Sequence, residues 1–371
     1  GYWRGSSVHI ADSLLPTATR NRTFVSKFNA ALQHQWTRIS DGMSADCQGN
    51  DVASDADKNV YITGNFEDNA FKIGPFVVQN YGGNNMWRDD AFLIKFDSLG
   101  NTQYLKHFGT PNDETALVIV ADSVGDVIVM GSASSSTSNF IFDDQTVLPG
   151  GTSSYNMYMA KFNGADGHCM WAKMAGGYNT SDQIYPWDAC LAEGNNVLFC
   201  GKITGQASLY PQTYYGYDGS GFLAKIDSNG NSLWLSVIGG SNSSEMATRV
   251  SYYNGMVAVC GTLYSNQPYV GNYPLYSTLT GGGFKTFNAM YNTSGETLWA
   301  RGNNPSSSTY YNGCVLIDNS GNQLLWGFFK SAQTWYPVSL TNSLSNFKLF
   351  LVKFHSFSPP TSFAVNAGPD K

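Results

Sequence analysis

The chain of 371 residues has a net charge of −6, and only 13% of its residues are charged, against about 25% in an average soluble domain. No cluster of lysine and arginine offers a surface for nucleic acid, and no apolar run approaches the ~18–20 residues of a membrane span. We therefore expect neither a nucleic-acid partner nor a membrane-spanning segment. An aromatic content of 14% together with 39 glycines favours short strands joined by tight turns.

The chain starts inside an expected strand, at Gly1-Tyr2-Trp3, with no signal peptide before it. This start predicts a fragment of a longer protein. Residues 1–44 supply three strands, of which the second contains Lys27 and the third contains Trp36. The pattern of these strands then recurs along the chain.

The repeat consists of an apolar strand with lysine at its fourth position and a following strand with an aromatic residue nine or ten positions later. The fourth residues are Lys27, Lys95, Lys161, Lys225, Met290 and Lys353, and the aromatic residues are Trp36, Tyr104, Trp171, Trp234 and Trp299. The fourth residues are thus 63 to 68 positions apart. A fixed period in a chain of strands predicts a propeller or another closed array.

Each repeat is expected to hold four strands, A to D in chain order. Strand A ends in an acid in four copies, as in Asp51-Val-Ala-Ser-Asp55, and strand B ends in glycine, as in Asn59-Val-Tyr-Ile-Thr-Gly64. Strand C is the lysine-containing run, and a tight turn such as Asp97-Ser-Leu-Gly-Asn101 joins it to strand D. Because strand C is apolar on both faces, we expect it to be buried between neighbouring sheets.

These motifs resemble the SBBP-type bacterial β-propeller repeat, whose pattern is roughly F-x-x-K-[FL]-D-x-x-G-N-x-x-W followed by A-x-x-I-x-x-D-x-x-G-N-x-Y-x-T-G. The resemblance covers nearly the whole chain, with departures at Met290 and in the last copy, which lacks the D-strand aromatic residue. It implies a propeller from a secreted or cell-surface bacterial protein. The end of the chain, Asn366-Ala-Gly-Pro-Asp-Lys371, resembles the start of a PKD-type immunoglobulin-like module.

The two ends of the chain set the expected number of blades. Residues 1–44 lack a strand A, and Ser362-Phe-Ala-Val-Asn366 has the pattern of one. If these segments pair, they close the ring through one shared blade and leave no exposed sheet edge. We therefore expect an all-β propeller of about six four-stranded blades, with five or seven as alternatives. It would be a single domain over residues 1–366, followed by the start of a linker at 367–371.

The longest connections join strand B to strand C and are expected at one end of the ring, the long-loop face. They cover residues 66–90, 133–156, 203–219, 262–284 and 329–348. Aromatic residues here and in the D–A connection 175–187 are candidates for ligand stacking: Trp87, Tyr185, Trp187, Tyr214, Tyr215, Trp335 and Tyr336. The favoured alternative is a repeated packed insert, recognised in Phe71-Lys-Ile-Gly74 and Phe140-Ile-Phe-Asp143, whose aromatic residues belong to the core.

No catalytic or metal-binding motif stands out, so we expect no catalytic residue, no metal site and no cofactor apart from a Ca²⁺ alternative. That alternative comes from acids in four D–A connections, namely Asp46, Glu114, Asp182 and Glu245. Their register varies, which favours acids that accept backbone N–H groups in their own loops. None of the five histidines accompanies a nucleophile signature. Six cysteines form no C-x-x-C pair, and we favour buried free thiols over disulfides.

The acid of strand A and the lysine of strand C are expected to form an ion pair that bridges over strand B. The four pairs are Asp55–Lys95, Asp122–Lys161, Glu193–Lys225 and Asp318–Lys353. The remaining unit has lost both members, with Tyr252-Tyr253 and Met290 in their places. Two strand spacings amount to about 9.5 Å, within reach of an extended lysine. The alternative is that the lysines extend into solvent while the acids cap their turns.

The sequence favours a non-enzymatic binding or display module of a secreted or cell-surface bacterial protein. Its partner would be a glycan or a protein on the long-loop face, as in adhesion, and the module would be a monomer within a multidomain chain. The alternative is a carbohydrate-active enzyme, a glycoside hydrolase or lyase, on a propeller scaffold. A dense cluster of acids with shifted pKa values would favour the enzyme, and an open face of aromatic and amide side chains would favour binding. A spacer without any ligand is a third hypothesis.

Overall fold

The computed structural model describes residues 1–355 except 12, 42–45, 68, 84–87, 135–137, 150–154, 178–181, 210–211, 216–218, 241–244, 266–267, 276–284, 303–309, 330–332, 336–337 and 341–346. The described elements are strands, apart from one 3-10 turn at Glu193–Asn195. That turn is too short to cross a membrane, and no other helix occurs in these residues. The chain divides into two compact units, Gly1–Thr180 and Ser181–Lys371.

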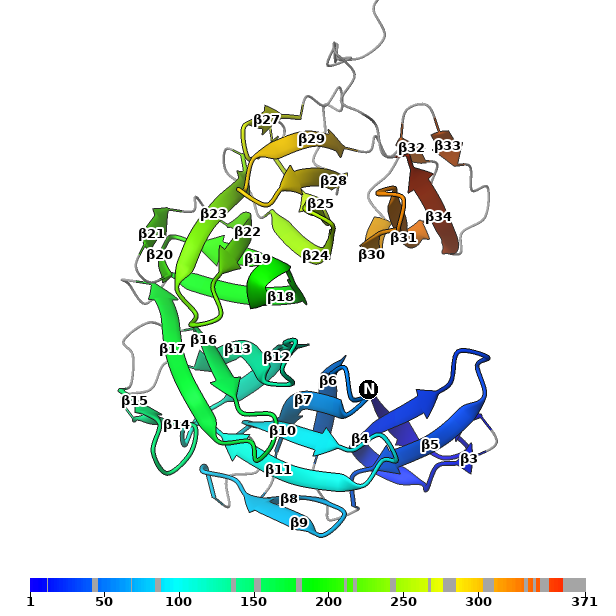
Figure 1. The fold of residues 1–371 in the computed structure, drawn as a ribbon, viewed down its shortest axis with the longest axis vertical. Coiled ribbons are helices and arrows are strands. Elements are labelled where there is room, and N and C mark those ends of the chain that lie inside the picture. Colours follow the sequence, from blue (N-terminus) through cyan, green and yellow to red (C-terminus); the bar gives the residue numbers. More distant parts are fainter. Residues whose placement is uncertain are drawn as a thin grey trace, which may run out of the picture. The chain divides into compact units, whose positions relative to one another are not determined.

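The first unit holds three antiparallel sheets whose strands follow one another in chain order (Figure 1). The first sheet is β1 (Tyr2–Gly5), β4 (Ala18–Phe28) and β5 (His34–Ile39). The second is β6 (Cys47–Ser54), β7 (Val60–Phe66), β10 (Asp90–Phe96) and β11 (Thr102–Phe108). The third is β12 (Glu114–Ala121), β13 (Val127–Ser134), β16 (Tyr155–Phe162) and β17 (Cys169–Gly177).

The second unit holds three further sheets with the same strand order. The fourth sheet is β18 (Gln183–Leu191), β19 (Val197–Thr204), β22 (Ser220–Ile226) and β23 (Ser232–Gly239). The fifth is β24 (Met246–Tyr253), β25 (Met256–Leu263), β28 (Lys285–Asn292) and β29 (Thr297–Gly302). The sixth is β30 (Tyr310–Ile317), β31 (Gln323–Phe329) and β34 (Lys348–Phe354).

Successive sheets of a unit pack face to face as propeller blades do. Strand A of one sheet contacts strand A of the next, β6 with β12 in the first unit and β24 with β18 and β30 in the second. Alternate residues of β10 enter two cores, because Phe92 packs between the first and second sheets and Leu93 between the second and third. A strand covered on both sides must be apolar on both faces, as the repeat predicted. The fold is an all-β propeller; ring closure by residues 362–366 falls outside the described residues and stays a prediction.

The glycine expected at the end of strand B lies two residues before the end of the strand and makes room for the aromatic residue of strand C. A Cβ added at Gly64 would lie 1.9 Å from the carbonyl oxygen of Gln48 on strand A and 2.8 Å from the ring of Phe92. Gly261 has the same neighbours in the fifth sheet, the carbonyl of Met246 and the ring of Phe287. The glycine and the aromatic residue of the repeat are therefore one packing unit.

The B–C connections contain hairpins. They are β8–β9 (Ala70–Ile73, Phe76–Gln79), β14–β15 (Phe140–Ile141, Val147–Leu148), β20–β21 (Gln206–Leu209, Gln212–Tyr215), β26–β27 (Tyr269–Val270, Tyr273–Pro274) and β32–β33 (Gln333–Trp335, Val338–Leu340). A further hairpin, β2–β3 (His9–Ile10, Ser13–Leu14), follows β1.

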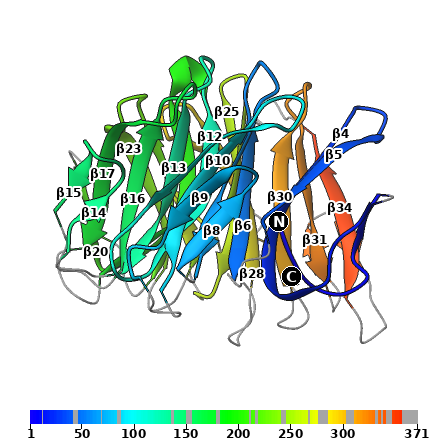
Figure 2. The ribbon, with the colours of Figure 1, turned by 90° about the horizontal axis from the view of Figure 1, so that it is seen from below.

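Hairpin β8–β9 folds back along strand D of its own sheet (Figure 2). Its tip residue Gly74 lies against Thr102 at the start of β11, and the backbone N–H of Asp41, just after β5 of the first sheet, donates to Lys72 (3.0 Å). In the fifth sheet the tip residue Gly271 lies in the same way against Thr297. These connections are therefore packed inserts that cover the outer strands, as the favoured alternative predicted.

Candidate functional site

The structure brings together the acid and the lysine in three of the four predicted ion pairs. These are Asp122–Lys161 and Asp318–Lys353, at 2.8 and 2.7 Å, and Glu193–Lys225. Each lysine stands near the end of strand C, opposite the acid that follows strand A, so the side chain crosses strand B. The three acids lie at the tight-turn end, where the A–B and C–D turns are.

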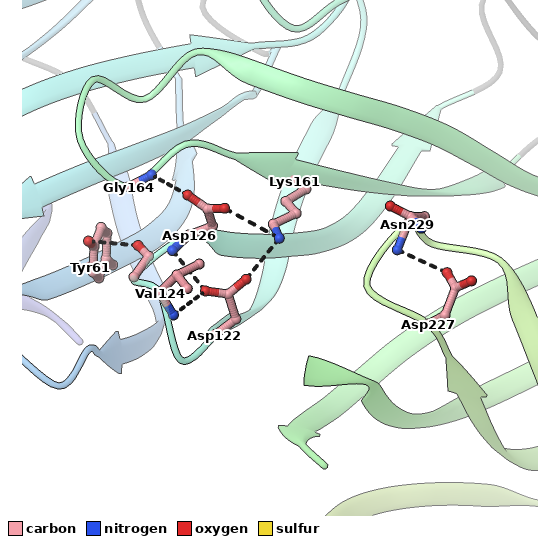
Figure 3. Close-up of polar contacts among 9 residues, drawn as sticks. Tyr61, Asp122, Val124, Asp126, Lys161, Gly164, Asp227 and Asn229 are labelled. Carbon is pink, nitrogen blue, oxygen red and sulfur yellow. Dashed lines mark hydrogen bonds and ion pairs between the residues drawn. The ribbon is translucent and has the colours of Figure 1, made fainter. Parts of the chain in front are cut away.

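The Asp122–Lys161 pair is the most buried of the three. Lys161 also lies 3.3 Å from Asp126 (Figure 3). The side chains of Lys161 and Asp122 are 10% and 3% exposed. Burial alone would lower the pKa of Lys161, but the hydrogen bond to Asp122 holds it above the usual value. Asp122 in turn accepts the backbone N–H groups of Val124 and Asp126, both at 3.0 Å. The charges are thus compensated within one turn and one strand.

The predicted pair Asp55–Lys95 is not formed, and the reason is Tyr61. This residue lies on strand B directly opposite Lys95, and its hydroxyl donates to Asp55 (3.0 Å). The ammonium of Lys95 lies over the Tyr61 ring, 5.4 Å from its centre, and donates to the carbonyl of Gly164 (2.6 Å). Burial alone would raise the pKa of Asp55, but hydrogen bonds from Asn59 and Tyr61 lower it overall.

Strand C lysines also bind the next sheet of the same unit. Lys27 donates to the carbonyl of Ser98 (3.0 Å) and Lys225 to the carbonyl of Thr293 (3.3 Å), both in the C–D turn of the following sheet. The strand D tryptophan donates its indole N–H to the same carbonyl, Trp36 to Ser98 (3.2 Å) and Trp234 to Thr293 (2.9 Å). Gly164, which accepts from Lys95, holds the same position in the third sheet. The lysine and the tryptophan are cross-strand neighbours in the repeat. Together they bind one carbonyl group of the next sheet, a contact that was not predicted from the sequence.

These contacts orient the sheets within each unit. A lysine near its own C–D turn reaches the C–D turn of the next sheet, so the tight turns of the two sheets lie at the same end. The B–C connections 66–90 and 133–156 of the first unit therefore leave their sheets from the opposite end, in the described residues. The same holds for 203–219 and 262–284 within the second unit.

The predicted ligand-stacking residues are only partly described. Trp87 and Tyr336 fall outside the described residues, as do the side chains of Tyr215 and Trp335. Tyr214 is half-buried, with its hydroxyl bonded to Gln212 and Ser232 (3.3 Å).

The remaining two residues of that set lie on strand β18. Tyr185 is half-buried, and Trp187 is 45% exposed at the bulge of this strand. Among the predicted ligand-stacking residues whose side chains are described, Trp187 is the one with an exposed ring.

A pair of buried carboxylates lies where the second and third sheets meet. Asp90 is the first residue of β10 and Glu114 the first residue of β12, and both are 0% exposed. A Cβ added at Gly109 would lie 2.7 Å from Glu114 Oε2 and 3.1 Å from Asp90 Oδ1, so both carboxylates face this glycine. Glu114 was expected in a connection but belongs to strand A.

The pKa values of this pair are strongly shifted. Burial raises the pKa of Asp90 to about 8; the nearby Glu114 adds to the shift and the N–H of Tyr81 opposes it. Burial raises the pKa of Glu114 to about 7, although the N–H (2.7 Å) and hydroxyl (2.8 Å) of Thr110 both donate to it. Burial lowers the pKa of His107, 3.9 Å from Asp90, to about 4.

Asp90 was not predicted as a site residue from the repeat, because no other copy has an acid at this position. The corresponding residues are Arg22, Asn156, Ser220, Lys285 and Lys348. The only available signal was an acid that departs from the repeat at the start of a strand C.

Two of the other D–A acids accept backbone hydrogen bonds, in both cases from residues outside their own loops. Asp46 accepts the N–H of Asn21 (2.8 Å), and Glu245 accepts the N–H of Ser265 (3.0 Å). Asp182 is buried against Gly205. Among the described residues, no three His, Cys, Asp or Glu side chains are grouped so that they could hold a metal ion.

All six cysteines are described and all are free thiols, as favoured from the sequence. Cys47, Cys169, Cys200 and Cys260 are buried, and burial raises the pKa of each thiol. A raised pKa keeps a thiol protonated and unreactive. The cysteines therefore act as small apolar core residues.

A crevice of about 640 Å³ lies between the first and second sheets at the tight-turn end. Its walls are mostly apolar, with Lys27, Asp55 and Lys58 among the polar residues. Lys27 is bound to two carbonyl groups and Asp55 to Asn59 and Tyr61. The crevice thus offers apolar surface, while the polar groups of Lys27 and Asp55 are engaged within the protein.

No protein-family profile and no curated protein matches this chain. Among solved structures, the chain is similar to "Drosophila Plexin A in complex with Semaphorin 1b", with 8% identity, a TM-score of 0.30 and coverage of 83% of this chain and 79% of the other. It is also similar to the K499G mutant of NanB sialidase from Streptococcus pneumoniae, with 9% identity, a TM-score of 0.25 and coverage of 76% and 53%. The fold assignment rests on the sheets described above, and the resemblance to SBBP-type repeats and to a PKD-type module stays a prediction.

Proposed function

We propose that this chain is a non-enzymatic binding or display module of a secreted or cell-surface bacterial protein, with a glycan or a protein as its partner. The observation that supports this best is the burial of the shifted carboxylates. Asp90 and Glu114 are 0% exposed, whereas a glycosidase needs an acid and a base that touch the substrate. Trp187 has the opposite character, since an exposed tryptophan offers a flat ring to a sugar or to a partner protein.

A glycan array probed with the wild-type chain and with Trp187→Ala tests this proposal. Binding that disappears in Trp187→Ala supports a glycan partner contacted by this ring. The matched control is Trp326→Ala, which removes another exposed tryptophan of the second unit and should leave binding intact. Equal binding by all three proteins would refute the role of Trp187, and an array without signal would leave a protein as the proposed partner.

The enzyme alternative is favoured by one observation, the raised pKa of Asp90 and Glu114, which is typical of catalytic acids. Incubation with polysaccharides followed by analysis of reducing ends or unsaturated products tests it. Product formation that is lost in Glu114→Gln would replace the binding proposal by the enzyme.

A further inference from the structure

We infer that Asp90 and Glu114 share one proton in the folded protein, and that loss of this proton at alkaline pH loosens the contact between the second and third sheets. Asp90 comes from strand C of the second sheet and Glu114 from strand A of the third. Their charge state therefore acts directly on the joint between two blades. The inference does not depend on any ligand.

The geometry places two buried carboxylates beside the same glycine. Both are fully buried, both face Gly109, and Asp90 Oδ1 has no hydrogen-bond partner among the described residues. The other oxygen of Asp90 accepts the backbone N–H of Tyr81 (2.8 Å). An ionised carboxylate with an unsatisfied buried oxygen is costly, whereas a protonated carboxyl can donate from that oxygen.

The charged groups around the pair do not neutralise it. The nearby cation Arg88 pairs with Asp113 (2.5 Å) and is 36% exposed, and its charge opposes the raised pKa of Glu114 without outweighing burial. From β11, His107 faces Asp90, but its lowered pKa leaves it neutral above about pH 4. Asp89, the residue before Asp90, is itself an acid whose pKa burial raises.

Within the part of the chain that the structure describes, the remaining elements around the pair add no positive charge. From β16, the buried hydroxyl of Tyr158 has a raised pKa, caused by burial and by Glu114. The ring of Tyr81 stacks on His107, with 4.5 Å between the ring centres. Burial raises the pKa of Tyr81 to about 12, and the charges of Asp90, Asp144 and Asp143 add to this shift. Two like charges in such a site cannot both ionise at neutral pH, so one proton stays with the pair.

The direction of the pH effect follows from the shifted values. The usual pKa values are 3.8 for Asp90 and 4.5 for Glu114, and folding raises them to about 8 and about 7. The folded state therefore keeps protons that the unfolded state has lost, and this stability, complete below about pH 4, is lost as pH rises through 7 to 8. His107 acts in the opposite direction, but only between about pH 4 and 6.5. Between about pH 6.5 and 8.5 His107 no longer contributes. The amino terminus, whose pKa burial lowers, acts in the opposite direction in this range but lies in the first sheet, away from this contact.

Hydrogen exchange read by mass spectrometry, corrected for the intrinsic pH dependence, tests the inference on the full chain. In the wild type, the opening equilibrium of peptides from β10 to β12 should rise with pH, by up to about tenfold per pH unit for one proton. In Asp90→Asn the rise above about pH 7 should disappear, because the amide stays neutral and Glu114, with a pKa of about 7, has already lost its proton. Peptides from β25 and β28 in the second unit should show no rise in either protein.

Asp97→Asn is the matched control, because Asp97 is a partly exposed turn carboxylate of the same sheet with a lowered pKa, caused first by the hydrogen bond from Asn101. This variant should keep the wild-type slope. Infrared difference spectra of the wild type between pH 6.5 and 8.5 need no variant and should show loss of the carbonyl stretch of a protonated carboxyl group. A wild type without that band, or a slope unchanged in Asp90→Asn, would overturn the inference.

Discussion

At the scale of single residues, the identity of one strand B side chain decides where a lysine binds. Ile128 stands opposite Lys161 and Leu198 opposite Lys225, and both lysines reach the acid beyond strand B. Tyr61 stands opposite Lys95, and its side chain is long enough for the hydroxyl to donate a hydrogen bond to Asp55 in place of the lysine. Lysine is flexible and finds another acceptor, the carbonyl of Gly164.

The buried pair Lys161–Asp122 gives the first stability prediction. Lys161→Met, which copies the residue at position 290, should lower the free energy of unfolding by about 3 kcal/mol, because Asp122 is left as an unpaired buried charge. Urea-induced unfolding measures the change. In the double variant with Asp122→Asn the two effects should not add, since the stranded charge is gone.

Lys353→Met is the control within the chain. The Lys353–Asp318 pair has the same chemistry, but the lysine is 45% exposed, so solvent screens it. This variant should destabilise much less than Lys161→Met. Equal losses in the two variants would contradict a role for burial.

At the scale of elements, the C–D turn is a docking point for the preceding sheet as well as a connection. Gly295 has a φ of +83°, and a Cβ added there would lie 2.7 Å from the ring of Trp234 on strand D of the fourth sheet. Gly100 meets Trp36 in the same way. The turn glycine thus serves both the backbone geometry and the approach of the tryptophan.

Gly295→Ala and Gly255→Ala separate these two roles. Gly255 lies in the A–B turn of the same sheet with a φ of +81° and no atom within 4 Å of an added Cβ. Gly255→Ala should cost only the backbone strain, about 1 kcal/mol, whereas Gly295→Ala should cost about 2 kcal/mol more through the clash with Trp234. Chemical denaturation of both variants measures the difference; equal costs would show that the turn does not hold the tryptophan.

The inserted hairpins show what element-level reasoning could and could not reach. The spacing of Phe71 and Phe140 predicted a packed insert, and both side chains are buried. The direction in which the hairpins fold, back along strand D toward Thr102 and Thr297, depends on contacts with strands that lie elsewhere in the chain. An outer strand covered in this way no longer offers a free edge for aggregation.

At the scale of the whole molecule, the ring closure predicted from the sequence can be tested by truncation. Removal of residues 362–371 should lower the melting temperature, because the first sheet would lose its predicted strand A and keep an open edge. Removal of residues 367–371 alone is the control and should leave the melting temperature unchanged. An equal melting temperature for both truncated chains would contradict the predicted pairing.

The all-β propeller class, the phase of the strands and three of the four acid–lysine pairs were predicted from the repeat alone. These features depend on the strand period and on neighbouring strands of one sheet, which the repeat displays directly. Three features became visible only in the folded chain. Lys95 binds Gly164, the inserts cover outer strands, and Asp90 and Glu114 are buried together beside Gly109. These features depend on how one sheet packs against the next. There, side-chain size and burial determine which of several partners a residue contacts, and the repeat pattern does not display either property.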